Sequence, residues 1–136
     1  MKFLVDANVL SEATKPAPEP RVIEWLRVHE RDLAVDPIIL GELRFGILRL
    51  AKGKKRTALE RWFAGGAERL ACLAWDADTG LRWAELLARL RAKGYTMPVK
   101  DSLIATTALV HDLTVVTRNG ADFRKAGVRL VDPFVM

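Results

Sequence analysis

The sequence of 136 residues has one cysteine, two histidines and no long apolar run. A single cysteine, Cys72, excludes an internal disulfide and fits a reducing compartment, and its apolar neighbours predict that its side chain is buried. No apolar stretch approaches the roughly 20 residues of a membrane span, and no secretory leader pattern opens the chain. We therefore expect a cytoplasmic protein.

The scarcity of histidine narrows the possible chemistry. His29 and His111 have no metal-ligand spacing, and neither stands near an acid at a spacing typical of a catalytic pair. The chain also lacks a nucleophile elbow. These absences disfavour a zinc site and exclude a Ser-His-Asp or Cys-His mechanism.

Positive charge is in excess, with 22 Lys and Arg against 17 Asp and Glu, a net charge of +5 and a pI near 9.7. This balance favours a polyanionic partner such as nucleic acid, although it suits an acidic protein equally well. A chain of this length can bury roughly two thirds of its unfolded surface, so it needs no disulfide or structural metal to fold.

Apolar periodicity predicts alternating strands and helices. Strands are expected at residues 3–5, 33–35, 70–75, 113–117 and 128–131. Helices are expected at residues 20–31, 37–50, 59–66, 77–93 and 101–110. No repeat, low-complexity tract or linker interrupts them, so we expect one domain over residues 1–136. The alternation predicts an α/β fold with three layers, α/β/α, around a mostly parallel sheet of four to five short strands.

Two acids are expected at the same edge of this sheet. Asp6 directly follows the first strand, in "KFLVDANVL", and Asp122 lies in the loop after the strand at 113–117, together with Asn119. Ligands of open α/β sheets bind outside the carboxyl ends of the strands. Both acids are therefore candidates for a site.

Two further acids stand on helices with apolar neighbours. Glu42 has Ile38, Ile39 and Phe45 at helical spacing, which predicts that it faces the sheet and needs a compensating partner. Asp101 begins the helix of "DSLIATTALV" on its apolar face.

Each acid alone also has a purely structural interpretation. Asp6 and Asp101 suit turns or helix N-caps, and Asp122 is an ordinary loop acid. Glu42 suits a buried ion pair with Arg44 or Arg49.

The joint placement of the four acids favours a site. Four carboxylates about 5 Å apart, at an effective dielectric of about 20, repel one another by roughly 20 kcal/mol in total. A small domain does not tolerate this without protons or a cation. An all-oxygen pocket selects Mg²⁺ or Mn²⁺ over zinc.

The acids and their surroundings resemble the PIN-domain family, in particular the VapC/FitB-like ribonuclease toxins of type II toxin–antitoxin systems. The resemblance is carried by "LVDANVLSEATKPAPEPRVIEWL", "LGELRFGI" and "VKDSLIATTALVHDLTVVTRNGADFRKAGVRLVDP", in this order. One departure is visible: many members have Asp-Thr-Asn where this chain has Asp6-Ala7-Asn8. A hydroxyl that would stand beside the first acid is therefore missing.

The resemblance implies a metal-dependent endoribonuclease that cleaves RNA with water activated by Mg²⁺, with Mn²⁺ as the alternative metal. It assigns catalysis and metal binding to Asp6, Glu42, Asp101 and Asp122. It places Asn8, Thr117 and Asn119 as their supports, with the Thr-Arg-Asn element supporting the fourth acid. It also implies a VapB-like antitoxin that docks beside the Glu42 helix, and a homodimer.

The substrate would need positive charge near the acids. Arg118, Arg124 and Lys125 lie nearest in sequence to the acidic edge, so we expect them to contact RNA phosphates. A basic run from Arg49 to Arg56 fits either RNA binding or a solvated loop.

Two other functions stay open from the sequence. The strand-end Asp6-Ala7-Asn8 is also faintly similar to the Asp-x-Asp of aspartyl-nucleophile phosphatases, although Asn8 then replaces the general acid. A non-catalytic module that binds nucleic acid or protein would use the acids only structurally.

Overall fold

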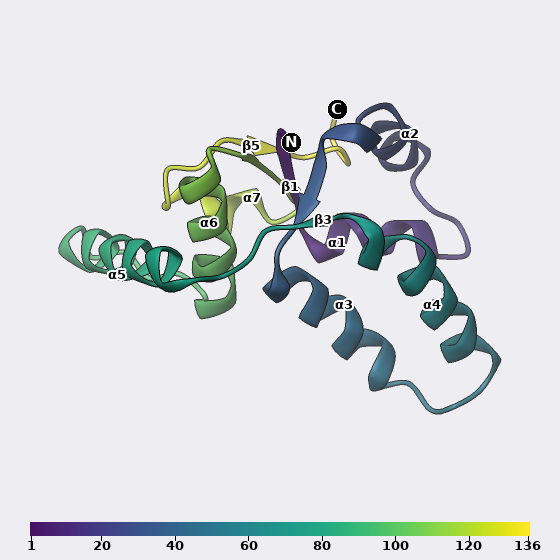
Figure 1. Cartoon of the computed structure of the whole chain (residues 1–136). Coiled ribbons are helices and arrows are strands. Elements are labelled where there is room, and N and C mark those ends of the chain that lie inside the picture. The colour runs from purple at the N-terminus through teal and green to yellow at the C-terminus, as the bar shows by residue number, and fades with distance from the viewer.

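The computed structural model describes residues 1–136 as a sheet flanked by helices (Figure 1). The five strands are β1 (Phe3–Val5), β2 (Leu33–Val35), β3 (Ala71–Cys72), β4 (Thr114–Val116) and β5 (Leu130–Val131). They form one sheet in the order β3-β2-β1-β4-β5, and every pairing is parallel. The prediction of an α/β fold around a mostly parallel sheet of four to five short strands is confirmed.

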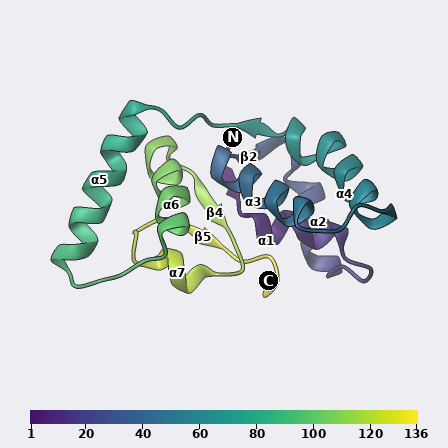
Figure 2. The same ribbon diagram turned by 90° about the horizontal axis from the view of Figure 1, so that it is seen from below.

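Seven α-helices connect the strands. They are α1 (Ala7–Leu10), α2 (Pro20–Val28), α3 (Pro37–Leu48), α4 (Lys54–Gly65), α5 (Ala77–Ala92), α6 (Val99–His111) and α7 (Gly120–Arg124). Short 3₁₀ turns follow at Ser11–Thr14, Glu30–Asp32 and Ala67–Arg69. Figure 2 shows α1 to α4 in one half of the molecule and α5 to α7 in the other. None of these helices combines the length and apolar character needed to cross a membrane.

Local sequence explains where the two helices beside β2 begin. Pro20 and Pro37 occupy the first helical position of α2 and α3, where the missing N–H costs nothing. Asp36 caps α3, because its Oδ1 accepts the Ile39 N–H at 2.9 Å. These signals fix the ends of helices that periodicity alone leaves uncertain.

The strand order reverses around β1. The chain runs outward from β1 through β2 to β3, and then crosses to β4 on the other side of β1. Such a reversal opens a crevice at the carboxyl ends of the two central strands. Asp6 follows β1 and Thr117 follows β4, so both lie at this crevice.

The core lies on and around the central strands. Leu4, Val5, Val115 and Val116 have no exposed surface, and Ile39 and Ile104 cover them from α3 and α6. Two expectations are wrong. Cys72 is exposed, because β3 is a two-residue edge strand, and Phe45 is 67% exposed, because the buried face of α3 is Ile39, Leu43 and Ile47.

Candidate active site

Asp6 is held at the crevice by three hydrogen bonds. Its Oδ1 accepts the Ala7 N–H at 2.8 Å, which makes Asp6 the N-cap of α1. Its Oδ2 accepts the Thr117 hydroxyl at 2.8 Å and the Asn8 amide at 3.3 Å. The side chain is only 4% exposed. The structural interpretation of Asp6 as a cap is thus correct, and it leaves the carboxylate fixed beside the other acids.

The polar residues around Thr117 support the first acid. The Thr117 oxygen donates to Asp6 and accepts from the Asn8 amide at 3.3 Å and from the Asn119 N–H at 3.0 Å. Asn8 Oδ1 accepts the Arg118 N–H at 3.2 Å. The resemblance placed this Thr-Arg-Asn element beside the fourth acid. In the structure its side-chain contacts go to Asp6, because β1 and β4 are neighbours in the sheet.

Asp101 lies in the first turn of α6 rather than at its cap. The helix begins at Val99 after Pro98, so the prediction that Asp101 starts the helix is corrected by two residues. Asp101 is 8% exposed, and no hydrogen bond from the protein contributes to the pKa of its carboxyl. A buried acid without donors is costly unless a cation or a proton accompanies it.

Two tryptophans fix the helix that carries Asp101. Trp83 donates from Nε1 to the Ser102 hydroxyl at 3.0 Å, and Trp75 donates to the Thr107 hydroxyl at 3.1 Å. Thr107 in turn donates to Asp36 at 2.6 Å. These bonds tie α6 to α5 and to the end of β2, so Asp101 is held on a supported helix.

Glu42 forms an ion pair that sequence reasoning missed. Its Oε2 lies 2.8 Å from the Lys100 ammonium, whereas Oε1 is buried and has no hydrogen-bond partner. The expected partners Arg44 and Arg49 do not pair with it; Arg44 pairs with Glu60. Lys100 directly precedes Asp101, so one cation stands between two of the four acids. Its adjacency to Asp101 was the only available signal.

Asp122 lies in the first turn of α7 and not in a loop. It is exposed, in contrast to Asp6 and Asp101. Its negative charge nevertheless reaches Asp101 and helps to raise the pKa of that carboxyl. Asp122 therefore forms the solvent-facing side of the acidic group.

Electrostatics couple the acids in pairs. Burial raises the pKa of Asp6 from 3.8 to about 6, helped by the charges of Glu42 and Asp101 and opposed by the Thr117 hydrogen bond. Burial, with the charges of Asp122 and Glu42, also raises the pKa of Asp101. Glu42 raises the pKa of Lys100. Raised carboxyl pKa values mark a place where added positive charge is stabilising.

The donors fit a hard divalent cation, which prefers carboxylate oxygens. The unpartnered Glu42 Oε1 and the hydrogen-bond-free Asp101 are the observations that support this fit. As the side chains stand, however, no three His, Cys, Asp or Glu residues are close enough to enclose an ion. Lys100 pairs with Oε2 of Glu42 and leaves Oε1 available, so a bound cation would share the Glu42 carboxylate with Lys100 or displace it.

A buried acid outside the predicted set lies nearby. Asp36 follows β2 as Asp6 follows β1, and it is fully buried. Its two oxygens accept the Ile39 N–H and the Thr107 hydroxyl. Both oxygens are thus used within the core, and Asp36 serves the fold.

The predicted basic residues separate into two places. The Arg118 guanidinium lies 4.4 Å from the centroid of the Phe134 ring. Arg124 and Lys125 instead line a hollow between α7 and the end of α5. The structure does not bring the three together.

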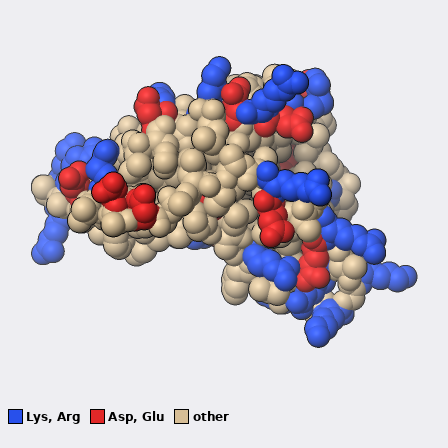
Figure 3. Space-filling model, viewed as in Figure 1, with Lys and Arg blue, Asp and Glu red and all other residues tan.

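A groove of about 800 Å³ runs between α1 and the α3–α4 hairpin, and Glu42 is the one acid of the four that lines it. Asn8 and Glu42 line it together with Lys15, Arg49 and Lys55. Leu43, Ile47, Leu59 and Trp62 supply its apolar lining. Figure 3 shows Lys and Arg side chains around this hairpin, at the lower right of the view.

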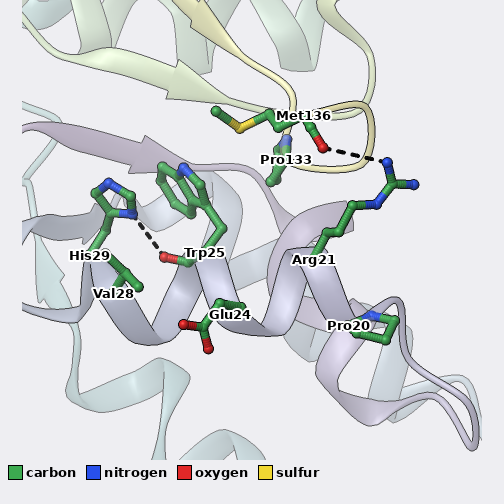
Figure 4. Close-up of a pocket in the computed structure, with 8 residues that line it drawn as sticks. All are labelled: Pro20, Arg21, Glu24, Trp25, Val28, His29, Pro133 and Met136. Atoms are coloured by element: carbon green, nitrogen blue, oxygen red, sulfur yellow. Dashed lines mark hydrogen bonds between the residues drawn. The ribbon is translucent and has the colours of Figure 1, made fainter.

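A separate hollow of about 460 Å³ lies between α2 and the C-terminal residues (Figure 4). None of the four acids lines it. His29 stacks on Trp25 with ring centroids 4.2 Å apart, and its Nδ1 lies 2.8 Å from the Trp25 carbonyl oxygen. This contact explains His29 as a packing residue.

The fold and its acids define a known class of protein. The model of the PIN domain family matches residues 3–128. The chain therefore belongs to the PIN domain family.

Individual relatives match over nearly the whole chain. The chain is 32% identical to the VapC ribonuclease Y4jK of Sinorhizobium fredii over 138 residues, which is 97% of each chain. It is also 32% identical to the toxin FitB of Neisseria gonorrhoeae, covering 97% of this chain and 98% of FitB.

Solved structures agree with this membership. The crystal structure of FitAcB from Neisseria gonorrhoeae superposes with a TM-score of 0.88 at 31% identity, covering 98% of this chain and 99% of that one. The DNA-bound VapBC of Salmonella typhimurium gives a TM-score of 0.82 at 25% identity and covers 98% of both chains.

Proposed function

We propose that the chain is a divalent-metal-dependent endoribonuclease and the toxin of a type II toxin–antitoxin pair, acting as one PIN domain over residues 1–136. The observation that carries the proposal is the electrostatic coupling of the acids: Glu42 and Asp101 act on Asp6, and Asp122 and Glu42 act on Asp101. Relatives named as ribonucleases and toxins support it. Its RNA substrate places the activity in the cytoplasm.

Asp6 and Asp101 are the principal proposed ligands of Mg²⁺ or Mn²⁺, with Glu42 and Asp122 completing the site directly or through water. When bound, the metal lowers the pKa of a water molecule and offsets charge on the scissile phosphate. The unpartnered Oε1 of Glu42 and the bare carboxylate of Asp101 support these roles.

The surrounding residues orient the first acid. Thr117 and Asn8 hold Oδ2 of Asp6, and the Ala7 N–H holds Oδ1. The absent hydroxyl at Ala7 leaves this arrangement intact, because Thr117 supplies a hydroxyl from the neighbouring strand. Lys100 neutralises Glu42, and its charge also lowers the pKa of the neighbouring Asp101.

The antitoxin fits the groove beside the α3–α4 hairpin. The groove has an apolar lining and two cations without an ion pair, Arg49 and Lys55, beside Lys15, which pairs with Glu12. This lining suits a segment with apolar and acidic side chains. Relatives solved as FitAB and VapBC complexes support a protein partner of this kind. The expected pairing of two copies of the toxin stays a prediction.

One experiment tests the function. Brief induction of the chain, followed by sequencing of cellular RNA 5′ ends, should reveal new ends and arrested growth. Asp101→Asn should lower cleavage by about a thousandfold, since losing a metal ligand removes several kcal/mol of transition-state stabilisation. Co-expression of the neighbouring gene's product should restore growth.

The matched control is Asp112→Asn, an exposed acid at the far end of α6 that pairs with Arg129. It should cleave RNA like the parent. If Asp101→Asn cleaved at the parent rate, or if no new RNA ends appeared with the parent, the proposed function would be wrong.

A further inference from the structure

Four cations and a tyrosine surround a hollow of about 500 Å³ between the end of α5 and α7. The charged and aromatic lining is Arg89, Lys93, Tyr95, Arg124 and Lys125. The remaining lining, Ala121 and Gly127, is uncharged, so no carboxylate faces the hollow. Figure 3 shows a group of Lys and Arg at the α5 end of the molecule, on the left.

None of the four cations forms an ion pair, although eight other Lys and Arg side chains do. The Arg89 guanidinium donates to the Ala126 carbonyl at 2.8 Å, and the Lys125 ammonium donates to the Thr96 carbonyl at 3.5 Å. These carbonyls orient the two cations and leave their charge uncompensated. The hollow therefore attracts an anion.

An exposed aromatic ring adds a second kind of contact. Tyr95 is 45% exposed, and the Lys125 ammonium lies 5.7 Å from its ring centroid. A cationic surface that also offers an aromatic face is the combination that binds single-stranded nucleic acid, because phosphates meet the cations while a base stacks on the ring.

The hollow adjoins the acidic group through two elements. In α7, Asp122 lies between Ala121 and Arg124, which both line the hollow. The loop that carries Tyr95 leads directly into α6, which carries Asp101. A strand that lies in the hollow therefore continues toward the acids.

We propose that this hollow is a subsite for single-stranded RNA, in which the cations bind backbone phosphates beside the scissile bond and Tyr95 stacks on one base. The assignment rests on the proposed function and adds the path of its substrate. It adds Arg89, Lys93 and Tyr95 to the residues expected to contact the substrate. Arg118, which lies at Phe134, is not part of this subsite.

The test measures binding without cleavage. A short unstructured RNA with a fluorescent end is titrated with the full chain in EDTA, by anisotropy, over a range of salt concentrations. Arg124→Gln combined with Lys125→Gln should weaken binding and reduce the slope of log affinity against log salt by about 1.4, since each phosphate contact contributes about 0.7. The control, Lys2→Gln with Arg31→Gln, removes equal charge at the amino ends of β1 and β2 and should change the slope far less.

Tyrosine variants separate stacking from charge. Tyr95→Ala should weaken RNA binding by about tenfold, and Tyr95→Phe should bind like the parent because it keeps the ring. A lack of difference between these two variants would overturn the stacking role.

Two further outcomes decide the assignment. The subsite would be wrong if the Arg124/Lys125 variant bound RNA like its charge control. It would also be wrong if a DNA duplex competed as well as the RNA. Both conclusions hold even if the parent cleaves RNA with Mg²⁺. If the variants behaved as expected while the parent failed to cleave RNA with Mg²⁺ or Mn²⁺, the subsite would stand and the proposed function would fall.

Discussion

Asp6 and Asp36 occupy equivalent places and have different surroundings. Each follows a central strand, caps the next helix and accepts a threonine hydroxyl. Both carboxylate oxygens of Asp36 accept hydrogen bonds inside the core, from the Thr107 hydroxyl and the Ile39 N–H. The Glu42 charge raises the pKa of both carboxyls, and Asp101 adds to the effect on Asp6. The comparison separates an acid whose two oxygens both serve the core from one that also lies near a second poorly exposed acid, Asp101.

The largest expected effect is a difference in sign between the two acids. At pH 7.5 in EDTA, Asp6→Asn should increase the free energy of unfolding by about 2 kcal/mol, because it removes a buried charge among like charges. Asp36→Ala should decrease it by about 2 kcal/mol, because it removes a helix cap and leaves the Thr107 hydroxyl without its acceptor. Urea unfolding measures both.

RNA cleavage completes this comparison. Asp36→Ala should retain cleavage per folded molecule, whereas Asp6→Asn should lose it. Equal signs in the unfolding experiment would show that the two carboxylates are not distinguished by their surroundings.

The next effect is the pH dependence of the Asp6→Asn gain. The folded protein holds the Asp6 proton up to about pH 6, against 3.8 for the ordinary carboxyl. Between these values the folded state binds more protons than the unfolded state, so this residue's contribution to stability falls as pH rises. The gain from Asp6→Asn should therefore shrink from about 2 kcal/mol at pH 7.5 to near zero at pH 4.

Unfolding curves of parent and variant at several pH values check this expectation. Carboxyls remote from Asp6 titrate equally in both proteins, so the difference reports on Asp6 and the acids coupled to it. A gain that stayed constant with pH would mean that Asp6 titrates normally.

The smallest expected effect concerns Lys100, which pairs with Glu42, one of the acids that act on Asp6. Because Lys100 pairs with Glu42 at 2.8 Å, an added cation has to compete with it. Lys100→Met should tighten Mn²⁺ binding by about tenfold in calorimetry, and Lys2→Met, at the opposite edge of the sheet, should leave it unchanged. Weaker or unchanged binding in Lys100→Met would show that the ion pair does not oppose the metal.

Much of the fold could be predicted from the sequence because its signals are local. All five strands appear where short apolar runs stand between helical patterns. The helices α1 and α7 were missed because they are one to two turns long and carry little periodicity. The exposure of Cys72 was missed because a two-residue edge strand has the same apolar sequence as a buried one.

The candidate site, like the fold, could be predicted from the sequence only in part. The four acids could be chosen from strand ends, helix faces and the family resemblance. The sequence could not separate "LVDANV" from "AVDPII", since Asp6 and Asp36 differ only in which distant residues meet them. The Glu42–Lys100 pair likewise joins two helices far apart in the chain, and no spacing rule connects them.

The pairing of β1 with β4 has a consequence for how the protein is made. Asp6 is synthesised before its Thr117 partner, which follows 111 positions later. Chains emerge and begin to fold from the N-terminus. The surroundings of Asp6 therefore cannot assemble until residues as far as Thr117 have been translated, so a product truncated before this point carries the first acid without its hydroxyl partner.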